Sequence, residues 1–177
     1  MNFKLFKLYM RIYYNFLLGR INYSIPKLQI DSLGIELNKN LLIIFPLDLD
    51  SFRVAAYSFR KLIDYDNSHK YTLLIDEKFK SLFYFNRAQI VYCKFNDKKE
   101  SISYDEILDN NSFDLIINLN VNEYFEIYKL IGNINCKYKV GIKSLFSSKF
   151  YNIEYERNVN GATEDTYQNI KLLLGQK

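Results

Sequence analysis

The sequence has few of the residues that build disulfide frameworks and metal sites. Its 177 residues include two cysteines, one histidine and no tryptophan. Cys93 and Cys136 are far apart in the chain, and neither is flanked by other metal-binding residue types. A disulfide scaffold and a Cys/His zinc site are therefore both disfavoured. We expect two reduced, buried thiols, as is usual in a cytoplasmic protein.

Glycine is also scarce, with six residues in the chain. Neither G-x-G-x-x-G nor G-x-x-x-x-G-K followed by Ser or Thr occurs, so a conventional dinucleotide or P-loop site is disfavoured. The single histidine, His69, lies in the polar segment 64–70, away from the end of any predicted strand. The sequence therefore offers no Ser-His-Asp set. We accordingly expect no bound cofactor and no metal ion.

Acidic residues are absent from residues 1–30, which carry five basic residues: Lys4, Lys7, Arg11, Arg20 and Lys27. The other 147 residues carry 19 basic and 20 acidic groups, so the net charge of +4 belongs to the N-terminal segment alone. A nucleic-acid-binding protein needs a basic face on its folded body. This distribution of charge disfavours nucleic acid as a partner.

Residues 2–19 predict a basic amphipathic helix, because polar residues recur in them at helical spacing. This polar stripe consists of Lys4, Lys7, Arg11 and Asn15. The uncharged run 12–19 is much shorter than the ~20 apolar residues of a membrane span, and Gly19 is suited to end the helix. Two interpretations are open. Either the helix packs on the domain with its basic stripe in water, or it lies on the anionic inner membrane, with the protein otherwise in the cytoplasm.

Residues 41–177 predict a single Rossmann-like α/β domain, which the helix at 1–20 and a connector at 21–40 precede. Five short apolar runs are typical of strands that are covered on both faces. The predicted strands are Leu41–Phe45, Tyr71–Ile75, Gln89–Cys93, Phe113–Leu119 and Tyr138–Ile142. The helices predicted between and after them are 52–63, 77–85, 104–108, 121–131 and 163–174. This alternation predicts a parallel sheet of about five strands with right-handed crossovers and helices on both faces.

Three further features of the domain follow from local sequence. The polar segment 94–103 and the segment 143–161 predict irregular loops. Gly132 and Asn133 are suited to end the helix at 121–131. Asp50 or Ser51 is suited to cap the start of the helix at 52–63.

Ligands of such sheets bind beyond the carboxyl ends of the strands, at a switch point. This rule selects residues 46–51, Asp76 and residues 118–122. Asp48 and Asp50 point the same way if their turn is extended, and the pair would then suit a general base with a charge partner, or a weak Mg²⁺ site. The alternative is a solvated turn that also caps the next helix.

Three more polar residues are candidates for ligand binding. Arg53 lies in the first turn of the helix at 52–63, where it could meet a phosphate; the alternative is an exposed arginine. Asn118 and Asn120 lie at the end of the strand at 113–119, where they could hydrogen-bond a sugar. The alternative for these two is an Asn-rich turn with no ligand.

Several segments also resemble a known family in their order and spacing. Leu41–Phe45, Asp50-Ser51 and Phe59-Arg60-Lys61-Leu62 form an apolar strand, a turn and a helix end. The strand and helix at 71–83 and the segment 113–142, which closes on a Lys-x-Gly strand, follow in turn. Over roughly residues 40–175 the chain is similar to the N-terminal half of the family 9 glycosyltransferases, GT-B enzymes that include the heptosyltransferases of lipopolysaccharide core assembly.

The resemblance implies a glycosyltransferase-like domain that is linked to the synthesis of cell-surface glycans or lipopolysaccharide. The family has Gly-Asp in its first turn, and this Asp is the proposed base that activates the acceptor hydroxyl. Here Asp50 stands in the Gly place and Ser51 in the Asp place, and a serine hydroxyl cannot act as that base unaided. Asp50 is therefore the candidate catalytic residue, with Asp48, Ser51 and Asn120 near the acceptor.

The family's enzymes also have a second Rossmann-like domain, which binds the nucleotide sugar. We find no counterpart of it in this sequence, so we expect activity only with a partner glycosyltransferase domain or a second copy of the chain. The alternative is a non-catalytic Rossmann-like module that binds a partner protein or a small ligand.

Overall fold

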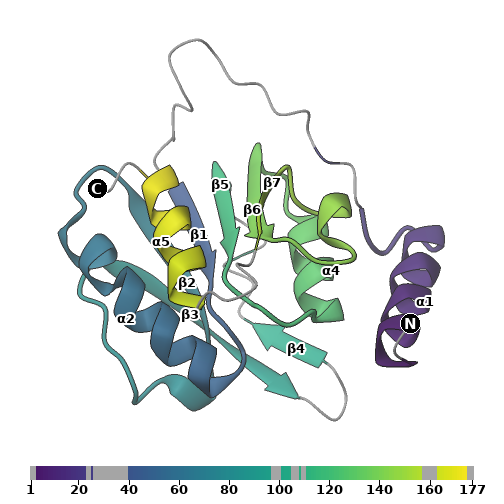
Figure 1. Cartoon of the computed structure of the whole chain (residues 1–177), viewed down its shortest axis with the longest axis horizontal. Coiled ribbons are helices and arrows are strands. Elements are labelled where there is room, and N and C mark those ends of the chain that lie inside the picture. Colours follow the sequence, from purple (N-terminus) through teal and green to yellow (C-terminus); the bar gives the residue numbers. More distant parts are fainter. Residues whose placement is uncertain are drawn as a thin grey trace.

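We analysed a computed structural model of the chain that describes residues 3–22, 25, 40–96, 101–104, 108, 111–156 and 163–174. The described residues form a sheet of seven strands in the order β4-β3-β2-β1-β5-β6-β7 (Figure 1). Neighbouring strands are parallel except β3 and β4, which are antiparallel. The strands are β1 (Asn40–Ile44), β2 (Lys70–Asp76), β3 (Ala88–Asn96), β4 (Ser101–Tyr104), β5 (Leu115–Asn118), β6 (Tyr138–Ile142) and β7 (Ile153–Tyr155).

Helices lie between the strands and on both faces of the sheet, so the predicted α/β fold is confirmed. The α-helices are α1 (Phe3–Leu17), α2 (Leu49–Tyr65), α4 (Phe125–Asn133) and α5 (Thr163–Leu173). Two short 3₁₀ helices, η1 (Glu77–Phe79) and η2 (Ser147–Lys149), complete the described elements. None of the helices in these ranges is long and apolar enough to cross a membrane.

The central strands divide their side chains between two cores, because successive residues of a strand point to opposite faces. In β1, Leu41 and Ile43 belong to the core under α2 and α5, whereas Leu42 and Ile44 belong to the core under α4. Both sets are fully buried. The continuous apolar run of β1 thus reflects burial on both sides, as the sequence predicts.

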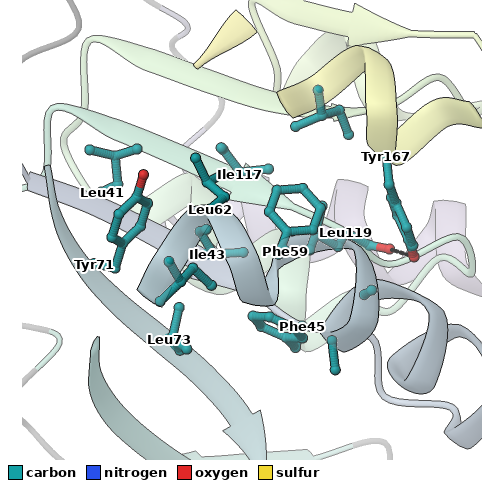
Figure 2. Packing of buried hydrophobic residues seen from close by; sticks show 14 of the residues in the cluster. Leu41, Ile43, Phe45, Phe59, Leu62, Tyr71, Leu73, Ile117, Leu119 and Tyr167 are labelled. Carbon is teal, nitrogen blue, oxygen red and sulfur yellow. Dashed lines mark hydrogen bonds between the residues drawn. The ribbon is translucent and has the colours of Figure 1, made fainter. Parts of the chain in front are cut away.

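The core under α2 and α5 is closed by aromatic residues. The rings of Phe59 and Tyr167 meet edge to face at 6.0 Å, which joins α2 to α5. The Tyr167 hydroxyl donates a hydrogen bond of 2.8 Å to the Leu119 carbonyl, which follows β5 (Figure 2). Phe52 of α2 stacks on Phe79 of η1 at 4.4 Å. Aromatic contacts therefore join α2 to α5 and to η1, and the Tyr167 hydroxyl ties α5 to the end of β5.

The predicted helix at 77–85 is wrong, since only the 3₁₀ turn η1 forms there. The Asp76 carboxylate caps this turn by accepting a hydrogen bond from the Lys78 amide. The chain then continues without helical structure and buries Phe85, whose ring lies 5.5 Å from that of Phe45. Burial of Phe85 in the core takes the place of a continued helix.

The loop predicted at 94–103 is also wrong in part. β3 continues to Asn96 and turns back as β4, so the sheet gains an antiparallel edge. Polar residues alternate there with Phe95 and Ile102, which pack on the core under α4. An edge strand that has one face in solvent needs apolar side chains on its other face only, so such an alternating sequence is sufficient for it. A helix is predicted at 104–108, but Tyr104 is the last residue of β4. Residues 105–107 lie outside the described residues.

The C-terminal half of the domain departs from prediction in two places. β7 pairs in parallel with β6 inside the segment 143–161, where no strand is predicted. α4 begins at Phe125 and ends at Asn133, so Gly132 lies inside the helix and does not end it. A Cβ at Gly132 would stand 2.5 Å from the carbonyl oxygen of Asn22. Glycine is required at this position because the backbone after α1 crosses α4 there.

The remaining predicted elements agree closely with the structure. α1 ends before Gly19, which has a positive φ of 65° and is the type of residue that ends helices. β6 has the predicted bounds, and α5 matches its prediction to one residue. Of the connector predicted at 21–40, the segments 23–24 and 26–39 lie outside the described residues.

Burial of both thiols makes the fold sensitive to alkaline pH. Burial raises the pKa of Cys93 from 9.0 to about 12, and that of Cys136 from 9.0 to about 11. A group whose pKa is higher in the folded state stabilises the fold below its unfolded pKa, and this stability is lost as pH rises through the folded value. We therefore expect the free energy of unfolding to fall progressively above about pH 9.

The contribution of each thiol can be measured by urea unfolding at pH 8 and pH 10.5. Cys93→Ala should remove up to about 2 kcal/mol of the loss between these two pH values, because each pKa unit corresponds to about 1.4 kcal/mol. Cys136→Ala should remove nearly the same amount, because pH 10.5 lies above the unfolded pKa of both thiols and below both folded values. A pH profile of Cys93→Ala that runs parallel to that of the wild type would contradict this expectation.

Candidate functional site

The candidate site lies at the carboxyl edge of the sheet, between β1 and β5. The chain leaves β1 into α2 on one face of the sheet, and it leaves β5 toward α4 on the opposite face. The two connections therefore diverge at adjacent strands. This is the topological switch point where ligands of open α/β sheets bind. The residues selected by the strand-exit rule do meet at this edge.

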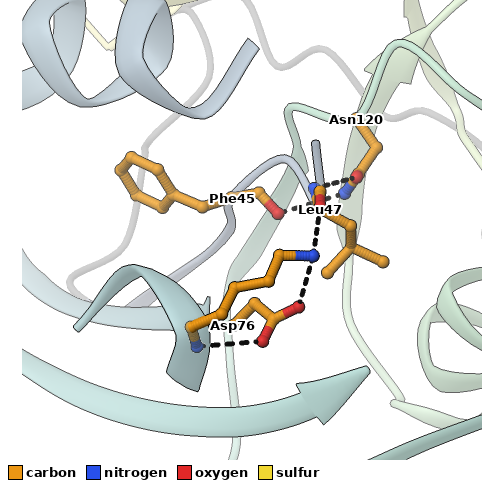
Figure 3. A network of polar contacts seen from close by, with 5 residues as sticks. Phe45, Leu47, Asp76 and Asn120 are labelled. Carbon is orange, nitrogen blue, oxygen red and sulfur yellow. Dashed lines mark hydrogen bonds and ion pairs between the residues drawn. The ribbon is translucent and has the colours of Figure 1, made fainter. Parts of the chain in front are cut away.

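The backbone of Leu47, just after β1, is held from two sides (Figure 3). Its amide donates a hydrogen bond of 2.9 Å to Asn120 Oδ1, and its carbonyl accepts one of 2.8 Å from Lys78 Nζ. The Lys78 ammonium also forms an ion pair of 2.9 Å with Asp76 Oδ2. Asp76 is buried at the end of β2, and the ion pair with Lys78 compensates the negative charge of its carboxylate. We call these contacts the Leu47 clamp.

Asn118 and Asn120 are both buried, and their side-chain amides bond within the protein. Asn120 Nδ2 donates to Asn118 Oδ1 at 2.8 Å and to the Phe45 carbonyl at 3.3 Å. Asn118 Nδ2 donates to the Tyr151 hydroxyl at 2.7 Å. The two asparagines thus fix the exits of β1 and β5. Their predicted contact with a sugar stays a prediction.

The turn after β1 differs from the sequence prediction. Asp48, and neither Asp50 nor Ser51, is the N-cap of α2: it has an extended backbone, and its Oδ1 accepts a hydrogen bond of 2.9 Å from the Ser51 amide. Asp50 already belongs to the first turn of the helix, so the extended Asp48–Asp50 pair is not formed. The cap falls on Asp48 because the last extended residue before α2 is Asp48, and its side-chain oxygen reaches the amide three positions later.

The predicted site residues of this segment have different surroundings. Asp50 and Arg53 are exposed on α2, and Ser51 is half-buried. Asp48 is half-buried too, but its Oδ2 atom is buried and has no hydrogen-bond partner among the described residues. A buried carboxylate oxygen without a partner is costly, so Asp48 Oδ2 is an unsatisfied acceptor within this turn. No three His, Cys, Asp or Glu side chains of the described residues converge as a metal site would require.

A cleft of about 690 Å³ lies beside this edge, between α1 and the segment that follows β5. Lys4, Lys7 and Arg11 line its α1 side. Asn122, Glu123 and Ser144 line the side formed by the sheet edge. The cleft therefore presents cations on one wall and hydrogen-bonding groups on the other.

A second polar cluster adjoins this cleft under α4. The Tyr128 hydroxyl lies 2.9 Å from Ser144 Oγ and 3.3 Å from Glu123 Oε1. Burial raises the pKa of Tyr128 and of Tyr151, so both phenols stay protonated and can donate hydrogen bonds. Gly141 on β6 leaves room for Tyr151, because a Cβ there would overlap its ring.

Sequence reasoning did not select this second cluster. Ser144 follows the strand at 138–142, so the strand-exit rule applied to that strand would have found it. Tyr128 lies within the predicted helix at 121–131, and Tyr151 lies in the segment predicted to be irregular. Neither belongs to a motif, so no sequence signal identified them.

Comparison with solved structures finds one protein of similar fold. The structure is similar to the crystal structure of the glycosyl transferase family 9 protein from Veillonella parvula DSM 2008, with a TM-score of 0.57 and 21% sequence identity. The match covers 80% of this chain and 42% of that chain. The chain has a glycosyltransferase-like fold. The sequence matches no protein-family model and no curated protein.

The glycosyltransferase-like fold supports the family resemblance seen in the sequence. At this identity the similarity establishes the fold alone. The chain spans less than half of the length of the Veillonella structure, in keeping with a domain that corresponds to one part of it. The polar groups at the carboxyl edge of the sheet are the features of this chain from which a function can be argued.

The Leu47 clamp predicts a clear difference between two neighbouring asparagines. Asn120→Ala would leave the Leu47 amide and the Phe45 carbonyl without their side-chain partner in a buried place. We expect a loss of about 2–4 kcal/mol in the free energy of unfolding, measured in urea. Asn122→Ala is the matched control: its side chain is exposed, and its effect should stay within about 0.5 kcal/mol. Equal stability of both variants would contradict the clamp.

Proposed function

We propose that this chain is the acceptor-binding half of a glycosyltransferase that acts in the synthesis of cell-surface glycans or lipopolysaccharide. The observation that carries the proposal is the fold similarity to a family 9 glycosyl transferase, which covers 80% of the chain. The family resemblance of the segments 41–62 and 113–142 supports it independently. So does the position of the polar groups, at the edge of the sheet where such folds bind ligands.

The proposed reaction is the transfer of a sugar from a nucleotide donor to an acceptor hydroxyl. Asp50, exposed in the first turn of α2, would take the proton from the hydroxyl as general base. The acceptor oxygen then forms a bond to the anomeric carbon, and the nucleoside diphosphate leaves with the electron pair of the bond that breaks. The half-buried Asp48 would orient the acceptor by accepting a hydrogen bond from a second hydroxyl. Ser51 and Asn120 would lie near the acceptor.

This reaction also needs a second domain that binds the nucleotide-sugar donor. The match covers 42% of the Veillonella chain, and in the family the nucleotide sugar binds to the second domain. We propose that a donor-binding domain, supplied by a partner protein or by a second copy, faces the exposed first turn of α2. The exposed Arg53 would lie in this interface, where it could contact a donor phosphate.

A transfer assay tests this proposal. Radiolabelled nucleotide sugars, with ADP-heptose first, are incubated with lipopolysaccharide core acceptors and the full chain, with and without the products of neighbouring genes. We expect transfer only with a donor-binding partner. Asp50→Asn should then lower kcat by about 10²–10⁴-fold, the usual contribution of a general base. Asp48→Asn should mainly raise KM.

Asp165→Asn, which removes an exposed carboxylate from α5, is the matched control and should keep full activity. Unchanged activity of Asp50→Asn would remove Asp50 as the base. Transfer by the chain alone would refute its dependence on a partner. Stable binding of a partner without any transfer would favour a non-catalytic interaction module.

A further inference from the structure

α1 contacts the rest of the molecule through only one side. Ile12 is the one buried residue of the helix, and Leu8 packs beside it against the core under α4. The Arg11 guanidinium lies 4.0 Å above the Phe125 ring and 2.9 Å from Glu126 Oε1. α1 is therefore attached to α4 by a narrow contact at the side of the domain (Figure 1).

Most of the remaining surface of α1 is apolar and exposed to solvent, although the Tyr9 ring also lies 6.0 Å from that of Phe146. Nine of the sixteen exposed large apolar side chains of the described residues belong to residues 3–18, with exposed fractions from 41% to 81%. They are Phe3, Phe6, Tyr9, Met10, Tyr13, Tyr14, Phe16, Leu17 and Leu18. If α1 packed on the domain through its whole apolar surface, these side chains would be buried, whereas they are exposed. An apolar surface of this extent is typical of an interaction site.

The charge of the helix indicates which partner fits this surface. Residues 1–30 contain five basic residues and no acidic residue. Lys4, Lys7 and Arg20 are exposed. A helix with basic residues beside a broad aromatic and aliphatic face is suited to the boundary between anionic lipid headgroups and acyl chains.

We propose that α1 lies in the plane of an anionic membrane surface and anchors the domain there. The apolar side enters the lipid boundary, and the exposed Lys4, Lys7 and Arg20 meet the headgroups. No helix of the described ranges spans a membrane, so contact of this kind is interfacial. Lys4, Lys7 and Arg11 also line the 690 Å³ cleft, so the anchor would bring the mouth of that cleft to the lipid surface. The inference does not depend on the proposed function.

Vesicle flotation with the full chain tests the anchor. We expect binding to vesicles of phosphatidylcholine and phosphatidylglycerol (7:3), at least tenfold weaker binding to pure phosphatidylcholine, and release in high salt. The triple variant Phe6→Ser/Met10→Ser/Leu17→Ser should lose at least tenfold in binding. Its three sites are exposed, so circular dichroism should show an unchanged fold.

The matched control is Tyr57→Ser/Tyr65→Ser/Leu172→Ser, which removes three other exposed apolar side chains, from α2 and α5, and should bind like the wild type. Lys4→Gln/Lys7→Gln should abolish the preference for anionic vesicles. Equal binding by the α1 triple variant and the wild type would overturn the proposal. So would a soluble dimer that binds no vesicles and that the triple variant converts to monomer in sedimentation equilibrium.

Discussion

The backbone of Leu47 is the point on which the candidate site depends. It lies between β1 and α2, and its amide and carbonyl are bound by side chains from the exits of two other strands. Asn120 follows β5, and Lys78 follows β2 and is itself paired with the buried Asp76. Buried polar groups of this kind destabilise a protein unless each has its partner. The clamp therefore fixes the start of α2, and with it Asp48 and Asp50, relative to the rest of the sheet edge.

The polar groups of the interior are concentrated on one face of the sheet. Thr72, Asp76, Asn118 and Lys139 occupy strand positions that alternate with residues of the core under α2 and α5, so they point toward α4. The Lys139 ammonium donates a hydrogen bond of 2.6 Å to the Ile131 carbonyl in the last turn of α4, where a cation is favoured. Burial lowers its pKa. The face of the sheet under α4 therefore holds these polar groups and adjoins the cleft. The face under α2 and α5 packs an apolar core.

Much of the fold could be predicted from the sequence, because β1 is a continuous apolar run, and β2 and β6 are mostly apolar and, like β1, buried on both faces. β3 was predicted shorter than it is, and β4 and β7 were missed. β4 and β7 are the two edge strands and β3 lies beside β4, so in all three strands polar residues mix with apolar ones. The 3₁₀ turn η1 replaced a predicted helix because Phe85 is buried against Phe45, a contact that no local pattern reveals.

The strand-exit rule located the site but not its internal bonds. It selected 46–51, Asp76 and 118–122, which do meet at the switch point. It could not show that Asn120 is bonded to Leu47, since the two residues are 73 positions apart in the chain. It could not show that Asp48 would be the cap of α2, because Asp48, Asp50 and Ser51 all have suitable side chains. The outward apolar side of α1 likewise follows from how that helix is docked and not from its periodicity.

Hydrogen exchange at the Leu47 amide, followed by NMR, tests the clamp most directly. Leu47 lies outside every helix and strand, so without the bond to Asn120 its amide would exchange like that of a loop residue. With the bond formed in solution, the amide should exchange as slowly as that of Ile43 in the centre of β1. Rapid exchange at Leu47 while Ile43 stays protected would contradict a prebuilt site at this edge of the sheet.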